Sequence, residues 1–271
     1  MQSSISSTEP KITEATIRRA LENGEFSYVY QPKVSMACNQ ICGAEALLRW
    51  ESVGKTIYPS DFIELAEKSS LMSEITNAML PRLINDINAI EAKAPGLIMS
   101  FNASVRDFTE GNMVATVVQA IADGKVQQGK LCVEVTETVL AKNVEAIENR
   151  FQVLLDAGVK LAMDDFGKGY SSLDLLSRLP FTCLKLDHSM VSKLGMSRKV
   201  DHIIESICAL AKKLGMNLIA EGVESGYAYT ELGKHGCDAA QGFWISHPLT
   251  LSEYIDFAQH NQSWGCARLA A

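Results

Sequence analysis

The feature that most constrains the fold of this chain is a regular alternation of short apolar, β-rich runs with longer amphipathic stretches. The expected strands are residues 26–33, 40–50, 97–102, 130–135, 159–164, 183–186, 216–220 and 237–241. Helical patterns are expected at residues 11–23, 59–68, 73–92, 113–123, 143–156, 171–178, 197–214, 226–234 and 251–259. Strands that alternate with helices in this way are mostly parallel and are joined by crossover helices.

The number of strands favours a closed α/β barrel over an open sheet. About eight strands in a chain of 271 residues fit the TIM (β/α)8 architecture, which takes roughly 250 residues. No helix separates the first two strands, so we expect a modified TIM barrel whose first strand is antiparallel. The alternative is an open doubly wound sheet, although no GxGxxG fingerprint supports it.

Composition and charge exclude several classes of protein. Hydrophobic residues make up 47% of the chain and charged residues 21%, which excludes a disordered or fibrous protein. The net charge of −7 argues against DNA or RNA as a partner, since a nucleic-acid groove carries a basic surplus. No apolar run approaches the ~18 residues of a membrane segment. Residues 1–10 are polar without a signal peptide, so we expect a flexible tail there and a single domain over residues 11–271.

The seven cysteines indicate a reducing compartment. None of them forms a CxxC pair, several lie in apolar runs, and no histidine stands at zinc-ligand spacing from them. Reduced, mostly buried thiols in a chain with a large core predict a cytoplasmic protein.

Acidic and amide side chains interrupt or end five of the expected strands. The residues are Glu45, Asn102, Glu134, the pair Asp164-Asp165, and Glu221. Because the carboxyl ends of parallel strands meet at one mouth of a barrel, these side chains should gather there. Each residue alone also has a plainer interpretation. A lone Glu is commonly a surface residue, the Asp pair could belong to a solvated turn before Gly167, and Lys185 and Asp187 could form a surface ion pair.

A shared metal site accounts for the acidic residues as a set. Several carboxylates gathered without cations would repel one another, and their pKa values would rise. A divalent cation removes that conflict, and oxygen ligands without His or Cys indicate Mg²⁺ or Mn²⁺ instead of zinc. The adjacent carboxylates of Asp164 and Asp165 could serve two neighbouring ions.

Ordered motifs surround these acidic residues. They are Tyr30-Gln31-Pro32-Lys33, Glu45-Ala46-Leu47, Phe101-Asn102-Ala103-Ser104, Glu134-Val135-Thr136-Glu137, Asp164-Asp165-Phe166-Gly167, Gly169-Tyr170-Ser171-Ser172-Leu173, Leu184-Lys185-Leu186-Asp187, Ala220-Glu221-Gly222-Val223-Glu224, Gly236-Cys237-Asp238 and Gln241-Gly242. In this order, and over roughly residues 26–249, the chain resembles the EAL-domain cyclic-di-GMP phosphodiesterases.

The resemblance implies hydrolysis of cyclic-di-GMP to linear 5′-pGpG by two-metal activation of water, and a homodimer. It also implies a role for individual side chains. These are Glu45, Asn102, Glu134, Asp164 and Asp165 as ligands of two Mg²⁺ or Mn²⁺ ions, Glu221 and Lys185 as catalytic residues, Gln31, Leu48, Arg49 and Gln241 as substrate contacts, and Glu137 as the brace of the loop at residues 165–172.

The sequence departs from the family pattern at four positions. Lys168 stands where a small Thr or Ala is usual, which bears on regulation through its loop more than on the chemistry. Thr182 replaces an Asp, and His188 and His247 stand where Arg is common.

Other functions remain open at this point. A receptor could bind cyclic-di-GMP without cleaving it, although such family members usually lack a metal ligand or the Lys/Glu pair, and both are present here. An interaction domain could dock to a partner protein. A different metal-dependent barrel hydrolase is the third alternative.

Overall fold

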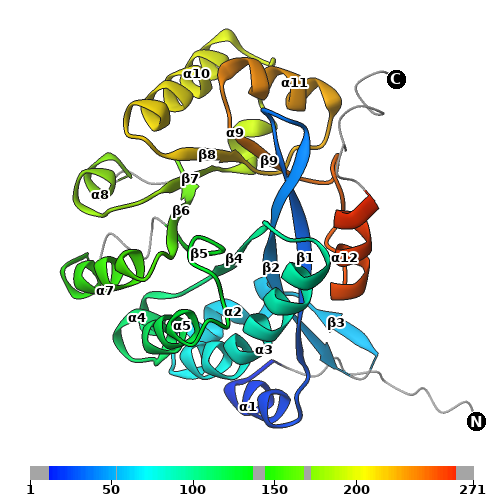
Figure 1. Ribbon diagram of the computed structural model, residues 1–271, viewed down its shortest axis with the longest axis vertical. Coiled ribbons are helices and arrows are strands. Elements are labelled where there is room, and N and C mark those ends of the chain that lie inside the picture. Colours follow the sequence, from blue (N-terminus) through cyan, green and yellow to red (C-terminus); the bar gives the residue numbers. More distant parts are fainter. Residues whose placement is uncertain (1–11, 53, 137–143, 168–171, 261–271) are drawn as a thin grey trace, which may run out of the picture.

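The computed structural model describes residues 12–52, 54–136, 144–167 and 172–260, and its centre is a closed ring of strands. The ring contains β1 (Phe26–Ser35), β2 (Gln40–Ser52), β4 (Ile98–Asn102), β5 (Leu131–Thr136), β6 (Lys160–Phe166), β7 (Cys183–Leu186), β8 (Asn217–Ala220) and β9 (Ala239–Gln241). The order is β1-β9-β8-β7-β6-β5-β4-β2, and β1 pairs with β2 to close it (Figure 1). The predicted α/β barrel is confirmed, and the open sheet is wrong.

The first strand has the direction expected from the sequence. β1 runs antiparallel to both of its neighbours, β2 and β9, whereas the other neighbouring strands of the ring pair in parallel. A short strand that was not predicted, β3 (Lys55–Ile57), pairs antiparallel with the far end of β2. Glu45 lies in the middle of β2, as it does in the strand expected at residues 40–50, and not at the carboxyl end where the acidic side chains were expected to gather.

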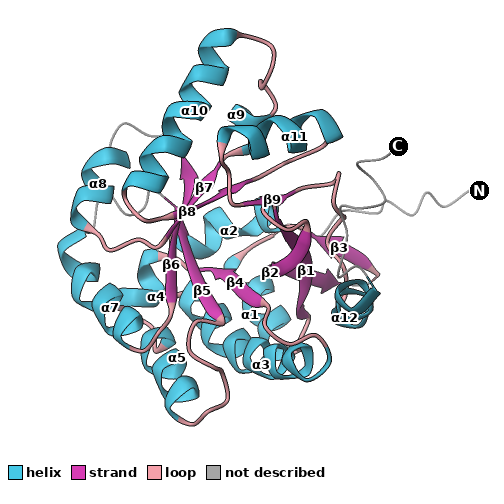
Figure 2. Ribbon diagram, turned by 45° about the horizontal axis from the view of Figure 1, so that its top comes forward, coloured by secondary structure: helices cyan, strands magenta, loops and turns pink. Residues whose placement is uncertain are grey.

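Helices surround the ring of strands (Figure 2). They are α1 (Glu14–Glu22), α2 (Pro59–Glu67), α3 (Leu71–Lys93), α4 (Val105–Thr109), α5 (Met113–Ala122), α7 (Val144–Asp156), α8 (Ser172–Arg178), α9 (His188–Val191), α10 (Arg198–Lys213), α11 (Gly226–His235) and α12 (Leu251–His260). The predicted helices are present with shifted ends, whereas the short α4 and α9 were not predicted. In the described ranges, no helix combines the length and the apolar character needed to cross a bilayer.

Aromatic and aliphatic side chains pack between the helices and the ring. Phe151 of α7 lies between Phe108 of α4 and Phe181, which precedes β7, with ring centroids 5.1 and 5.6 Å apart. All three rings are buried. Such close packing holds the strands in place from outside, so the side chains inside the barrel have fixed anchors.

Inside the barrel, the side chains change from apolar to mostly charged over two residues along the strands. Side chains on the same face of a strand recur every second residue. One interior group is apolar and consists of Ile98, Cys132, Ala162, Cys183 and Ile219. Two residues further along the same strands stand Ser100, Glu134, Asp164, Lys185 and Glu221. The candidate site therefore rests on a packed apolar floor, as the core of such a barrel requires.

Candidate active site

The ammonium group of Lys185 lies among four carboxylates inside the barrel. Its Nζ is 2.5 Å from Oε1 of Glu221, 3.1 Å from Oε2 of Glu45 and 3.4 Å from Oδ1 of Asp164. It also forms an ion pair with Oε2 of Glu134. The Lys185 side chain is only 1% exposed. The barrel thus brings together residues of β2, β5, β6, β7 and the end of β8, as the sequence predicted, and Lys185 is not a surface ion pair.

Glu134 is held by two lysines. Its side chain is fully buried, and its Oε1 accepts a hydrogen bond of 2.7 Å from Nζ of Lys33 while its Oε2 contacts Lys185. Lys33 is buried as well, and its Nζ also donates to Oγ of Ser100 at 2.6 Å. Burial opposes ionisation, but the two ammonium groups outweigh it and lower the pKa of Glu134. Glu134 is therefore a carboxylate despite its burial.

Two amide side chains fix the carboxylate of Glu45. Nδ2 of Asn102 donates to Oε1 of Glu45 at 2.6 Å. Nε2 of Gln241 donates to Oε2 of Glu45 at 2.9 Å and to Oε1 of Gln31 at the same distance. These bonds join β1, β2, β4 and β9, so both oxygens of Glu45 have a defined orientation.

Negative charge exceeds positive charge in this centre. Burial raises the pKa of Glu221 to about 8, with Asp164 and Glu45 adding to the rise and Lys185 opposing it. Burial likewise raises the pKa of Asp164 to about 6, again against the effect of Lys185. Carboxylates with raised pKa values gain from any additional cation that neutralises them.

The donor set fits divalent cations that prefer oxygen. Its members are carboxylates and amides, without His or Cys, which suits Mg²⁺ and Mn²⁺ better than zinc. Oε1 of Gln241 is buried and accepts no hydrogen bond from the described residues. Within the described ranges, no three acidic, His or Cys side chains stand in ligand geometry, and Lys185 instead bridges the carboxylates. The fit therefore rests on donor chemistry and surplus negative charge.

A break in strand register places two consecutive aspartates at the end of β6. The pairing of β6 with β7 shifts between Met163 and Phe166. Asp165 has a φ of 59°, in the left-handed region that non-glycine residues rarely adopt, and its backbone N–H donates to Oδ1 of Asp164 at 2.8 Å. Bulges of this kind re-aim side chains at barrel rims. The loop continues outside the described residues, which omit Glu137 and Lys168.

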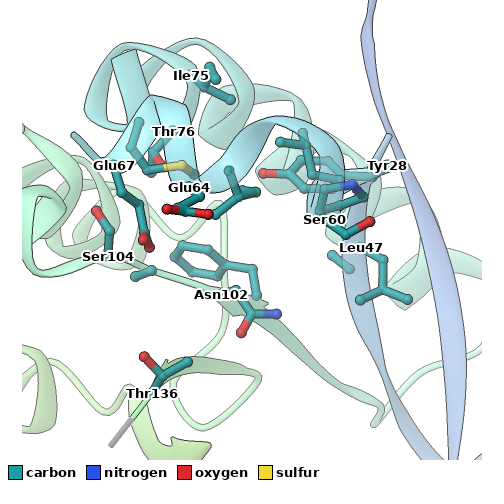
Figure 3. Close-up of a pocket in the computed structure, with 17 residues that line it drawn as sticks. Tyr28, Leu47, Ser60, Glu64, Glu67, Ile75, Thr76, Asn102, Ser104 and Thr136 are labelled. Atoms are coloured by element: carbon teal, nitrogen blue, oxygen red, sulfur yellow. The ribbon is translucent and has the colours of Figure 1, made fainter. Parts of the chain in front are cut away.

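Two pockets adjoin at the hydrogen bond between Asn102 and Glu45. The first, of about 470 Å³, is lined by Asn102 and by apolar side chains that include Leu48 and Phe101. In Figure 3, Glu64 and Glu67 extend from α2 toward this space. The second pocket, of about 360 Å³, is lined by Gln31, Glu45, Asp164, Lys185, Glu221 and Gln241, and further by His188, Glu224 and Phe243. The charged centre thus opens beside a largely apolar pocket.

The expected substrate contacts divide between these surfaces. Gln31 and Gln241 line the second pocket, and Leu48 lines the first. The guanidinium group of Arg49 donates to the carbonyl oxygen of Leu48 at 2.7 Å and lies 5.3 Å from the ring centre of Tyr58. Arg49 is therefore close to the first pocket without being among the side chains that line it.

Sequence reasoning missed Lys33, Ser100, Glu64 and Glu67. Side chains two residues apart in a strand lie on the same face. Lys33 stands two residues after Gln31, so the sequence did indicate that both side chains share a face. Ser100 has the same relation to Asn102. Glu64 and Glu67 resemble the polar face of an ordinary surface helix, and only the fold shows that they border a pocket.

Comparisons with known proteins give one family. The sequence matches the EAL domain family over residues 14–248. The cyclic di-GMP phosphodiesterase RocR of Pseudomonas aeruginosa is 30% identical over 245 residues, which cover 90% of this chain and 62% of RocR. An uncharacterized protein of Synechocystis is 32% identical, and the match covers 90% of this chain and 35% of that protein. The chain therefore spans less than two thirds of the length of these curated relatives.

Solved structures agree with the match. The structure described as "PaMucR Phosphodiesterase, c-di-GMP complex" superimposes with a TM-score of 0.82 and 31% identity, covering 89% of this chain and 98% of that one. The EAL enzyme Bd1971, in a form bound to cAMP and cyclic-di-GMP, superimposes with a TM-score of 0.84 and 29% identity, covering 90% of this chain and 67% of that one.

Proposed function

The chain belongs to the EAL domain family, and on that premise we propose that it hydrolyses cyclic di-GMP to linear 5′-pGpG with two divalent cations, Mg²⁺ or Mn²⁺. The observation that carries this proposal is the buried group of Glu45, Glu134, Asp164 and Glu221 around Lys185, beside a pocket of about 470 Å³. The names of RocR and PaMucR as phosphodiesterases support the same reaction.

The cations would be held by oxygen ligands at the end of the barrel. Glu45, Asn102, Glu134 and Asp164 would bind one ion, and Asp164 and Asp165 would bind the second. When bound, such a pair of ions lowers the pKa of water and neutralises the charge that develops on phosphate oxygens. The surplus of buried carboxylates supports this assignment, because the two lysines do not neutralise all of them.

Glu221 and Lys185 would act on the attacking water and on the phosphate. Glu221 accepts a proton from the water while the water oxygen attacks phosphorus. The bond from phosphorus to the 3′ oxygen breaks, and the 3′ oxygen takes up a proton from solvent and leaves as a hydroxyl group. The position of Glu221 supports this role, because Glu221 lines the same pocket as Glu45 and Asp164, and a general base must lie within reach of the water that it deprotonates. Lys185 holds Glu221 at 2.5 Å and, through its ammonium group, offsets negative charge on the phosphate.

The apolar pocket would receive one guanine base of the substrate. Leu48 and Phe101 supply apolar walls for a planar ring, and Glu64 and Glu67 supply carboxylates that accept hydrogen bonds from the N1 and N2 groups of guanine. Gln31 and Gln241 would contact a phosphate on the other side of Glu45. Arg49, whose guanidinium group suits a phosphate, would contact the substrate from the side of the first pocket, where it lies beside Leu48 and Tyr58.

Several roles stay predictions. They are Glu137 as a brace for the loop at residues 165–172, a homodimer, one domain over residues 11–271, and a cytoplasmic location. Glu137 lies outside the described residues. The described cysteines are free thiols, as a reducing compartment requires.

The proposal is tested by incubating the protein with cyclic di-GMP and Mg²⁺ or Mn²⁺, with chromatography of the products. We expect 5′-pGpG from the unmodified chain and from Glu148→Gln, which changes an exposed residue of α7, but none from Glu45→Gln. Calorimetry with the same ligand distinguishes the alternatives. Tight binding without product would identify a receptor. The absence of both binding and product would contradict cyclic di-GMP as the substrate.

A further inference from the structure

Lys33 is a charged residue in a place where barrels of this kind carry apolar side chains. It belongs to β1, it is 4% exposed, and it lies level with Gly43 of β2 and Gln241 of β9 in the strand register. Gly43 has no side chain, and a Cβ there would lie 2.0 Å from the carbonyl oxygen of Ile98. The register of β1 shifts directly after Lys33. These features accommodate a long side chain directed into the barrel.

The ammonium group of Lys33 reaches across the interior to two other strands. It donates to Oε1 of Glu134 on β5 at 2.7 Å and to Oγ of Ser100 on β4 at 2.6 Å. Lys185 contacts the other oxygen of Glu134, Oε2. The two oxygens of this carboxylate are therefore divided between two lysines, and Lys33 holds the one that does not face Lys185.

Stability alone does not explain a lysine at this position. Removing an ammonium group from water is costly, and a buried ion pair replaced by apolar residues of similar volume is often no less stable. The neighbouring interior group of Cys132, Ala162 and Cys183 shows that this barrel packs small apolar side chains where no charge is required. The lysine thus serves the carboxylate that it contacts.

We propose that Lys33 is a positioning residue, which holds Oε1 of Glu134 so that Oε2 alone is presented to the group of carboxylates and to a divalent cation bound there. This inference rests on the proposed function. Lys33 lines neither of the two pockets. It acts through Glu134, as hydrogen-bond partners of metal ligands generally do.

A positioning role and a purely electrostatic role of Lys33 predict opposite changes in cation affinity when Lys33 is replaced. Deleting a positive charge near a cation site should tighten cation binding if repulsion were the main effect. Deleting a hydrogen bond that orients a ligand should weaken it, by about 10- to 100-fold. The direction of the change therefore separates a positioning role from an electrostatic one.

The test measures Mn²⁺ affinity by calorimetry in the substrate-free protein. We expect Lys33→Met to weaken Mn²⁺ binding by about 10- to 100-fold, and Lys33→Gln, whose amide still donates a hydrogen bond, to weaken it less. Cys208→Ala, which changes a buried residue of α10 outside the ring of strands, should leave the affinity unchanged. Far-UV circular dichroism confirms that each variant is folded, and Lys33→Gln takes the place of Lys33→Met if the latter does not fold.

A double-mutant cycle identifies the residue through which Lys33 acts. In a Glu134→Gln background, Lys33→Met should change Mn²⁺ affinity by less than about threefold, because the carboxylate that it orients is gone. Unchanged or tighter binding in Lys33→Met alone, or an equal loss in both backgrounds, would overturn the positioning role. Absence of Mn²⁺ binding in the unmodified chain is a different result, and it would overturn the proposed function together with this inference.

Discussion

Nε2 of Gln241 lies 2.9 Å from Oε2 of Glu45, although the two residues are 196 positions apart in the chain. The same nitrogen contacts Oε1 of Gln31 at 2.9 Å. The bond spans the place where the antiparallel β1 separates β9 from β2 in the ring. Because the barrel is closed, a side chain of β9 orients the carboxylate of Glu45 on β2, although β9 and β2 are not neighbouring strands.

Loss of this bond should impair catalysis without unfolding the chain. We expect Gln241→Leu to lower kcat/KM for cyclic di-GMP by about 10-fold or more, since the partners of a metal ligand commonly contribute that much. The matched control is Gln119→Leu on the exposed face of α5, which should be unaffected. Equal kcat/KM values for the two variants would contradict the role of Gln241.

Glu221 should matter for the reaction and not for binding of the substrate. Glu221→Gln removes the proposed general base and is expected to lower kcat by about 10²- to 10⁴-fold. Calorimetric affinity for cyclic di-GMP should change little, and Glu205→Gln, an exposed residue of α10, serves as the control. A variant that keeps its kcat would show that another group accepts the proton.

Much of the fold and of the charged centre could be predicted from the sequence, because both follow from local pattern. Short apolar runs that end in Asp, Asn or Glu specify strands whose ends meet, and this placed Asn102, Glu134 and Asp164 correctly. Glu45 lies in the middle both of the strand expected at residues 40–50 and of β2, so the pattern of acidic residues at strand ends does not apply to it.

Long-range contacts account for what the sequence did not reveal. Lys33 has an ordinary place in a strand, and its contacts with Ser100 and Glu134 depend on which strands lie across the barrel from β1. Glu64 and Glu67 lie on a surface helix and gain significance only because α2 borders a pocket (Figure 3). The helices α4 and α9 are too short for a periodic pattern, with five and four residues.

The stability of the metal-free protein should fall as pH rises. Folding raises the pKa of Asp164 from 3.8 to about 6 and that of Glu221 from 4.5 to about 8. The folded state therefore binds more protons, and this stabilising contribution is lost as pH rises through those values. We expect the Tm in EDTA to fall between about pH 5 and about pH 9, and to fall less in Glu221→Gln.

Mg²⁺ should reverse this trend, because it competes with protons for the same carboxylates. The gain in Tm on adding Mg²⁺ is expected to be small near pH 5 and to increase toward pH 9. A gain that is independent of pH would show that Mg²⁺ binds elsewhere.

Selectivity for guanine should depend on Glu67. Burial, with Asp107 and Glu64 nearby, raises the pKa of this carboxyl group, which a ligand that donates hydrogen bonds would counteract. Glu67→Gln should raise KM for cyclic di-GMP about 10-fold, and it should narrow the discrimination against cyclic di-AMP, whose adenine lacks the N1 donor. Glu22→Gln on α1 is the exposed control. If Glu67→Gln left the ratio of kcat/KM for cyclic di-GMP to kcat/KM for cyclic di-AMP unchanged, the guanine base would not bind beside Glu67.

The central claim, that water attacks phosphorus at this group of carboxylates with the aid of divalent cations, is tested most directly in water enriched in ¹⁸O. The protein is given Mn²⁺ and cyclic di-GMP for a single turnover, and the product is analysed by mass spectrometry. We predict one ¹⁸O atom in the 5′-phosphate of pGpG, and no product in EDTA or from Glu45→Gln. Product formed without cations, or a 5′-phosphate without label, would contradict the account.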